Sequence, residues 1–141
     1  MIAFCTHCWA EIDAALGACP SCGENLNSDA RTYEQKLIAA LEHPLPEARV
    51  RICWLIGENN IQVAVPDLMK VAESDPDLFV RRAALEALAV FRDPRAVPLL
   101  EGISRSDNRF LAAAARRSLD TVSSLKGKDL REWKDPFCST S

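Results

Sequence analysis

The stretch that decides the fold runs from Val80 to Leu88 and reads VRRAALEAL. Its apolar positions recur 32 residues earlier in residues 48–56 (ARVRICWLI) and 31 residues later in residues 111–119 (LAAAARRSL). A second match places residues 64–68 (AVPDL) on residues 96–100 (AVPLL). A period in this range is typical of a solenoid, in which short helical units stack on one another.

Each unit is predicted to contain a pair of helices. The apolar positions of residues 78–91 follow one helical face, and the other segments show the same 3.6-residue pattern between turn residues. We expect one pair at residues 47–56 and 63–73, a second at 78–91 and 93–104, and a last helix at 109–125. A helix at residues 32–42 is then the second member of a truncated first unit. About three helical pairs are expected in all.

The run of residues 80–88 followed by residues 93–100 (DPRAVPLL) resembles the short HEAT-like repeats of phycobiliprotein lyases and of many bacterial scaffold proteins. This resemblance implies an all-α fold, a short right-handed α-solenoid of HEAT-like helical hairpins over residues 28–126. The recurring residues are packing residues, so the resemblance is specific for fold and not for function. It favours a protein-binding adaptor or scaffold, with a role as accessory to a chromophore or cofactor lyase as a further alternative.

An enzymatic function is not expected from the motifs. Deoxyhypusine hydroxylase, a relative of such repeat proteins, holds iron with His-Glu pairs, whereas His7 and His43 are not followed by Glu. No Ser-His-Asp set, Cys-His set or glycine-rich phosphate loop occurs at a credible spacing. We therefore predict a non-enzymatic protein with no small-molecule substrate.

The N-terminal residues 1–27 contain two Cys-x-x-Cys pairs, separated by ten residues and formed by Cys5, Cys8, Cys19 and Cys22. Two such turns can supply the four thiolates of a tetrahedral zinc site, and four protein ligands leave no open position for catalysis. We therefore predict a structural Zn²⁺, whose binding provides most of the folding free energy of so short a segment. His7, inside the first pair, is either an alternative ligand or an ordinary polar side chain of the turn.

The second pair, CPSCG (residues 19–23), resembles the second knuckle of small bacterial zinc ribbons. Trp9 departs from that pattern, because the first knuckle of such ribbons usually carries glycine there, so this turn is expected to be strained or to use another geometry. Residues 1–28 contain three acidic residues and no Lys or Arg. A thiolate-bound zinc adds negative charge, so we expect the ribbon not to bind a phosphate backbone.

Candidate partner-binding residues are those that break the repeat or recur as charges. Trp54 aligns with charged residues of the other units, and we expect the ribbon or the first helix to cover it, with a partner-binding anchor as the alternative. The recurring arginines either bond neighbouring turns, which we favour, or bind nucleic acid. They are Arg49, Arg81, Arg82, Arg116 and Arg117.

Composition sets the remaining expectations. The 17 basic and 20 acidic residues give a net charge of −3, which provides no general attraction to nucleic acid or to anionic membranes. We expect no signal peptide, no transmembrane helix and a cytoplasmic location, since paired cysteines without an export signal favour metal binding over disulfides. Trp133 and Phe137 in residues 127–141 are predicted to cap the last unit, or to belong to a flexible docking tail.

Overall fold

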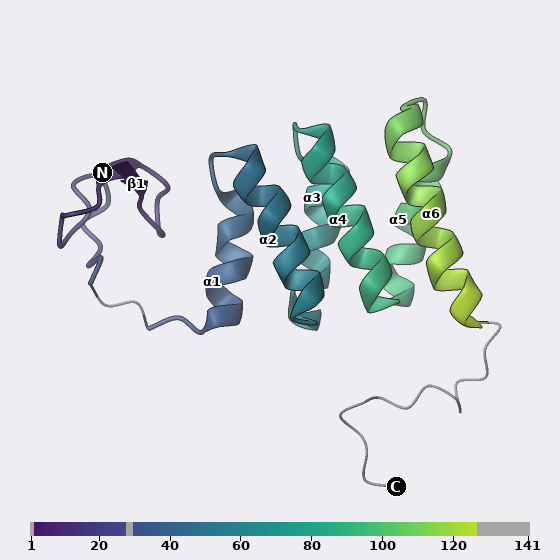
Figure 1. The fold of residues 1–141 in the computed structure, drawn as a ribbon, viewed down its shortest axis with the longest axis horizontal. Coiled ribbons are helices and arrows are strands. Elements are labelled where there is room, and N and C mark those ends of the chain that lie inside the picture. The colour runs from purple at the N-terminus through teal and green to yellow at the C-terminus, as the bar shows by residue number, and fades with distance from the viewer. Residues whose placement is uncertain (1, 28–29, 127–141) are drawn as a thin grey trace, which may run out of the picture.

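The computed structural model describes residues 2–27 and 30–126. Within them six α-helices stack in two layers, and a small N-terminal module lies at the α1 end of the stack (Figure 1). One layer contains α2, α4 and α6, and the other contains α1, α3 and α5. The helices are α1 (Tyr33–Ala39), α2 (Pro46–Glu58), α3 (Val65–Ser74), α4 (Leu78–Phe91), α5 (Val97–Ser104) and α6 (Arg109–Lys126). Short 3-10 helices at Ala40–Glu42, Gln62–Ala64 and Pro94–Ala96 extend α1 and precede α3 and α5.

The N-terminal module contains two short antiparallel strands, β1 (Ile2–Phe4) and β2 (Glu11–Asp13). Ala3 lies opposite Ile12 in this pairing, and a single bridge joins Ala18 to Asn25. A two-stranded sheet of this length is marginal in water without further support. The module therefore depends on contacts other than its ladder, and the cysteines provide them.

Polar side chains cap the N-termini of two of the helices. Thr32 caps α1 in a capping box with Gln35, in which each side chain accepts from the other's backbone N–H. Asp77 caps α4 by accepting from the N–H groups of Phe79 and Val80. Asp93 caps the 3-10 turn that precedes α5, by accepting from the N–H of Arg95.

The predicted pairing of the helices is wrong by one helix. Helix α3 packs along α4, and α5 packs along α6, whereas α2 lies beside α4 in the same layer. The antiparallel hairpins are therefore α1 with α2, α3 with α4, and α5 with α6, and the first unit is not truncated. The repeat period gives the spacing of equivalent residues, but a unit can begin at either of its two helices. The period therefore does not show whether a helix forms its hairpin with the helix before it or with the helix after it.

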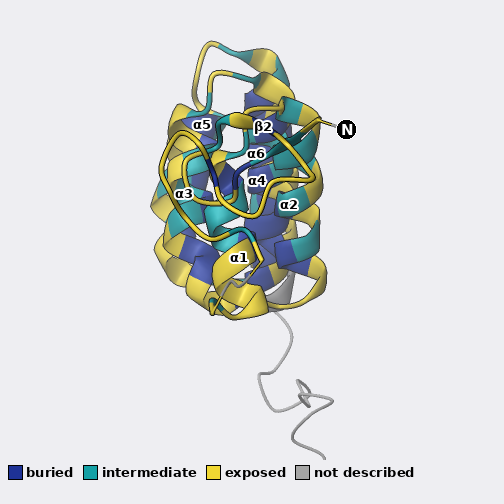
Figure 2. Ribbon diagram, turned by 90° about the vertical axis from the view of Figure 1, so that its left-hand side faces the viewer, coloured by how far each residue is buried: buried dark blue, intermediate teal, exposed yellow. Residues whose placement is uncertain are grey.

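The core lies between the two layers, where the buried residues gather when the stack is viewed end-on (Figure 2). It is one continuous cluster from Leu37 in α1 to Ala115 in α6. Helix α4 contributes the most to it, because it has neighbours on three sides in α2, α3 and α6. Leu85 and Leu88 are fully buried there. The predicted solenoid of stacked hairpins is thus confirmed.

In the described parts of α5 and α6, no large apolar side chain is exposed. The predicted cap by Trp133 and Phe137 falls in residues that lie outside the described part of the chain. Within residues 2–27 and 30–126, no helix combines the length and the apolar character that crossing a bilayer requires.

Candidate functional sites

The structure brings the four cysteines of the N-terminal module together. The sulfur atoms of Cys5, Cys8, Cys19 and Cys22 all lie within 4.8 Å of one another. The distance from Cys5 Sγ to Cys22 Sγ is 3.7 Å, and that from Cys8 Sγ to Cys19 Sγ is 3.6 Å. Bonds of about 2.3 Å to one tetrahedral zinc place the sulfurs about 3.8 Å apart. All four cysteines are free, and their spacing fits a single metal ion.

Backbone N–H groups point at two of the sulfurs in the same way. His7 N donates to Cys5 Sγ at 3.4 Å, and Ser21 N donates to Cys19 Sγ at 3.3 Å. Such bonds stabilise a thiolate, and hydrogen bonding from the Cys22 backbone, with that of Ser21, lowers the pKa of Cys19 to about 6. The donor set is therefore suited to a soft divalent cation such as Zn²⁺.

The metal-competent group among the described residues consists of the four cysteines and leaves out the ring of His7. His7 is exposed, and its backbone, not its imidazole, contacts the cluster.

The two cysteine turns share one backbone geometry. Trp9 N donates to Cys5 O at 2.9 Å, and Gly23 N donates to Cys19 O at 2.8 Å. Both residues have positive φ, 61° for Trp9 and 79° for Gly23. This left-handed conformation is free of steric cost for glycine and costs an L-residue about 1–2 kcal/mol. Trp9 is therefore strained, as the departure from the ribbon pattern predicts, but it keeps the usual turn.

The strained Trp9 lies at the contact between the module and the helical stack. Its ring centroid is 5.1 Å from that of His43, in the loop before α2, and Phe4 meets the same imidazole edge-on at 4.9 Å. Arg31 adds a hydrogen bond to the Thr6 carbonyl at 3.2 Å. Aromatic pairs contribute about 0.5–1.5 kcal/mol each beyond their burial, which is enough to offset the strain of Trp9. We call Phe4, Trp9 and His43 the aromatic joint.

His43 itself is held in the neutral form that this contact suits. Burial and the nearby Arg49 charge lower the pKa of His43, and its Nδ1 accepts a hydrogen bond from Leu45 N at 3.1 Å. His43 lies in a loop beside Pro44, and its ring has a packing role that the sequence did not indicate.

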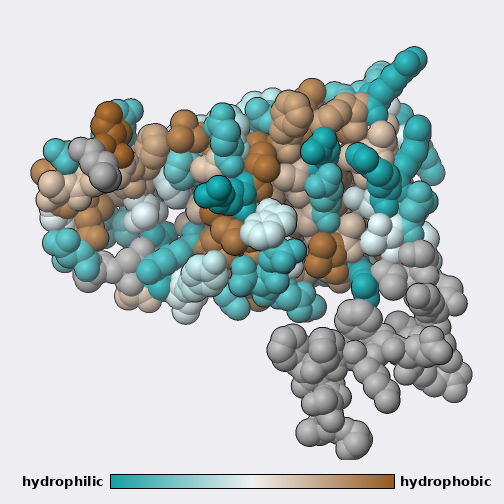
Figure 3. Space-filling model, in the orientation of Figure 1, coloured by the Kyte–Doolittle hydropathy of each residue, from teal (hydrophilic) through white to brown (hydrophobic). Residues whose placement is uncertain are grey.

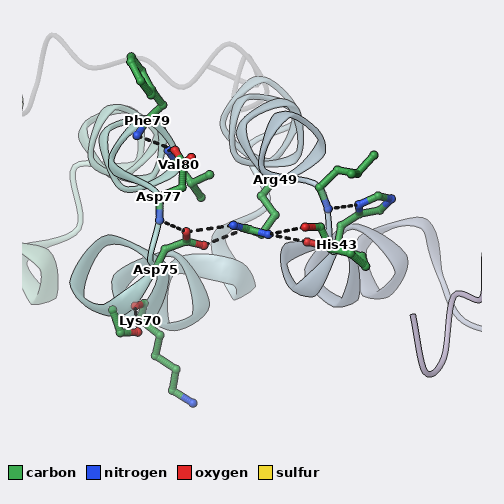
Figure 4. Close-up of polar contacts among 10 residues, drawn as sticks. His43, Arg49, Lys70, Asp75, Asp77, Phe79 and Val80 are labelled. Carbon is green, nitrogen blue, oxygen red and sulfur yellow. Dashed lines mark hydrogen bonds and ion pairs between the residues drawn. The ribbon is translucent and has the colours of Figure 1, made fainter. Parts of the chain in front are cut away.

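Arg49 forms the most buried ion pair in the described part of the chain (Figure 4). Its Nε lies 2.9 Å from Asp75 Oδ2, its Nη2 lies 3.2 Å from Asp75 Oδ1, and its Nη1 donates to the His43 carbonyl at 2.8 Å. The Arg49 and Asp75 side chains are 12% and 7% exposed. This two-pronged contact joins the loops of the first two hairpins, so Arg49 holds neighbouring units together.

Two more of the candidate arginines bond helix ends. Arg81 Nε donates to the Ala72 carbonyl at 2.8 Å, and Arg116 Nη2 donates to the Ser104 carbonyl at 3.1 Å. Both carbonyls lie in the last turn of the preceding helix, where backbone acceptors lack helical partners. These contacts agree with the favoured interpretation of the recurring arginines as bonds between neighbouring turns.

Arg82 and Arg117 lie on the outer surface of the α2, α4 and α6 layer. The Arg82 guanidinium lies 5.9 Å from the Phe79 ring centre and 5.3 Å from that of Phe110, and it pairs with Glu86 at 3.4 Å. Arg117 borders a hollow of about 430 Å³ between α4 and α6. The five candidate arginines thus have different surroundings and do not form one stripe.

The prediction that the N-terminal module or the first helix covers Trp54 is wrong. The Trp54 side chain is 60% exposed and borders a hollow of about 640 Å³ between α2 and α4. The module contacts the loop before α2 through the aromatic joint, which does not reach the outer face of α2. Figure 3 shows this face, where hydrophobic surface gathers over α2 and α4 and hydrophilic residues predominate over α6.

We call this hollow the Trp54 groove. Gly57, Ala83 and Ala87 are small residues between the two helices, and the side chains of Trp54 and Val90 stand beside them. Val90 is 54% exposed. Sequence analysis missed Val90 because it aligns with the polar Glu58 of the previous unit, although that break in the repeat is the same signal that singled out Trp54.

The antiparallel hairpins define the chain as an α-solenoid with a cysteine-rich N-terminal module. The family of HEAT repeats matches residues 34–120, so the chain belongs to the HEAT-repeat proteins. It is also similar to deoxyhypusine hydroxylase of Schizosaccharomyces pombe, with 30% identity over 95 residues. That match covers 67% of this chain, and the chain spans 30% of the enzyme's length. No solved structure matches the chain.

This similarity contradicts the prediction that the chain is non-enzymatic, because the curated relative is an enzyme built on such repeats. The prediction rested on the absence of a few motifs, the His-Glu pair among them. The absence of these motifs excludes only the particular active sites that they form, and not every activity that a repeat scaffold can carry.

Proposed function

We propose that this HEAT-repeat protein is a scaffold that binds a protein partner in the Trp54 groove and carries a structural zinc ion in its N-terminal module. The single observation that supports partner binding is the exposure of Trp54 beside the groove between α2 and α4. Tryptophan is among the residues most enriched at the energetic centres of protein interfaces. The four clustered thiols and a cytoplasmic location belong to the same proposal, since a reducing compartment keeps them available for metal.

The neighbourhood of Trp54 supports a protein partner. Trp54 and Val90 present apolar surface on either side of small residues, so a side chain from a partner can enter between them. Burial of an indole contributes about 25 cal/mol for each Å² removed from water. A nucleic-acid ligand is less well supported, because Arg49, Arg81 and Arg116 already bond a carboxylate or carbonyl groups of the chain.

Photo-crosslinking in the protein's own cells tests the groove. A photoreactive phenylalanine analogue replaces Val90 in one variant and Val63 in the other. Val63 is the matched control, since it is a valine at least as exposed as Val90 and precedes α3 in the other layer. The proposal predicts one protein adduct from position 90, absent from position 63 and lost when Trp54→Ala is added. Adducts of equal yield from both positions, or none that depends on Trp54, contradict it.

A further inference from the structure

The Trp54 groove has an acidic residue near each end of the side that α2 forms. Glu47 lies at the start of the α2 wall and Glu58 at its end, with Trp54 between them. Both carboxylates are exposed, and among the described residues neither has an ion-pair partner. Glu86 on α4 is different, because it pairs with Arg82. Arg51 also borders the groove, but its one positive charge balances only one of these two carboxylates, so one negative charge remains in excess.

The distance between these two carboxylates sets the length of a ligand that can contact both of them. Glu47 and Glu58 are eleven positions apart on one helix, which corresponds to about 16 Å at 1.5 Å per residue. A partner helix of about three turns spans the same distance. Grooves between two parallel helices accept such a helix, with apolar anchors on one face at i, i+3 or i+4.

Resting on the function proposed above, we propose that the Trp54 groove binds a short α-helix of a partner protein whose apolar anchor lies between two basic residues, one near each end. The anchor packs against Trp54 and Val90, above the small residues Gly57, Ala83 and Ala87. The two basic residues pair with Glu47 and Glu58. Such rim pairs are exposed, so they select the partner and its register more than they add affinity.

Three synthetic helical peptides of fifteen residues test this arrangement by fluorescence anisotropy with the full chain. All carry the same apolar stripe of leucines. The first has lysine near both ends, the second has glutamate at those two positions, and the third has both lysines moved to the middle of the polar face. Two surface ion pairs of ordinary strength change an affinity roughly tenfold. The first peptide is therefore expected to bind at least ten times more tightly than the second, and measurably more tightly than the third.

Variants of the chain separate charge from shape. The double change Glu47→Gln and Glu58→Gln is expected to remove the preference among the peptides, while Glu73→Gln, an exposed residue of α3, leaves it intact. High salt is expected to reduce the preference in the same way. Ala83→Phe fills the groove and Trp54→Ala removes its wall, and each abolishes binding of the first peptide. Circular dichroism confirms that each variant keeps its helices.

Equal binding of the first two peptides, or of the first and third, overturns the inference and leaves the proposed function standing. Binding of the first peptide that survives both Ala83→Phe and Trp54→Ala overturns it as well, since the peptide then sits elsewhere. Failure of all three peptides to bind also overturns it. The crosslink at position 90 decides the proposed function separately.

Discussion

The N-terminal module and the helical stack are held together by different means. The buried cluster of the module consists of Cys5, Ile12 and Cys19, and two of these three are candidate metal ligands. The stack has a continuous apolar core from Leu37 to Ala115. A core of three residues cannot offset the conformational entropy of about 25 residues, whereas the core of the stack can. With the zinc ion proposed above, the chain would combine a small fold that depends on metal with a helical stack that does not, and the two meet at His43.

Metal removal is expected to have the largest effect, and to act on one region. Chelation, or the single change Cys8→Ser, unfolds residues 2–26, because structural zinc contributes about 10–16 kcal/mol to such segments. The helices of the stack persist. Zinc content by native mass spectrometry and helix content by circular dichroism measure the two parts. The matched control is Cys53→Ser, which changes a buried thiol of α2 that lies outside the cluster and leaves zinc binding unchanged.

A core substitution in α4 is expected to show the opposite pattern. Leu88→Ala removes a fully buried side chain and destabilises the stack by about 2–5 kcal/mol. Urea unfolding followed by circular dichroism measures this loss, and Val63→Ala at an exposed site changes the stability by less than about 0.5 kcal/mol. Bound zinc is retained in both variants before the unfolding transition. Loss of zinc from folded Leu88→Ala protein would show that the two regions do not fold independently.

The buried ion pair between the first two hairpins is expected to matter next. Asp75→Asn keeps a side-chain oxygen for the Asp77 N–H but leaves the Arg49 charge without its partner. Removing one member of a largely buried pair costs about 3 kcal/mol. Glu73→Gln, an exposed carboxylate two residues away, is the control and is expected to be neutral. If the two variants have the same unfolding midpoint in urea, the pair does not join the hairpins as described.

The smallest expected effect is at the aromatic joint. Trp9→Gly relieves the left-handed strain, so the module keeps its zinc at least as well as the native chain does. The variant loses the contact with His43, worth about 1 kcal/mol. Chelation is therefore expected to lower the melting temperature of the stack slightly in the native protein and less in Trp9→Gly. An equal shift in both would show that Trp9 does not couple the two regions.

Sequence reasoning reached the features that local chemistry determines. The limits of α4 follow from the turn residues before it and from an apolar face with the helical period, and the cysteine cluster follows from ligand spacing. It did not reach the features that depend on which elements meet. Helix pairing, the exposure of Trp54 and the Arg49 to Asp75 contact across two loops all require knowledge of neighbours that a repeat period does not contain.

The two cysteine turns also differ in how much of their structure local sequence determines. A glycine at position 23 predicts a left-handed residue directly, since glycine adopts positive φ without cost. Trp9 takes that conformation because it occupies the same place in its cysteine turn, and its ring packs on His43, more than thirty positions away in the sequence. Its strain was expected from the departure from glycine, but the contact that offsets the strain was not.

Hydrogen exchange of the full chain, followed by mass spectrometry before and after chelation, tests the contrast between the two regions most directly. We expect amide protection in residues 2–26 to be lost when metal is removed. Protection in α2, α4 and the other core helices is expected to fall only by the small amount that the aromatic joint contributes. Protection of residues 2–26 that does not change on chelation would contradict it. So would a loss of protection in α4 equal to that in the module.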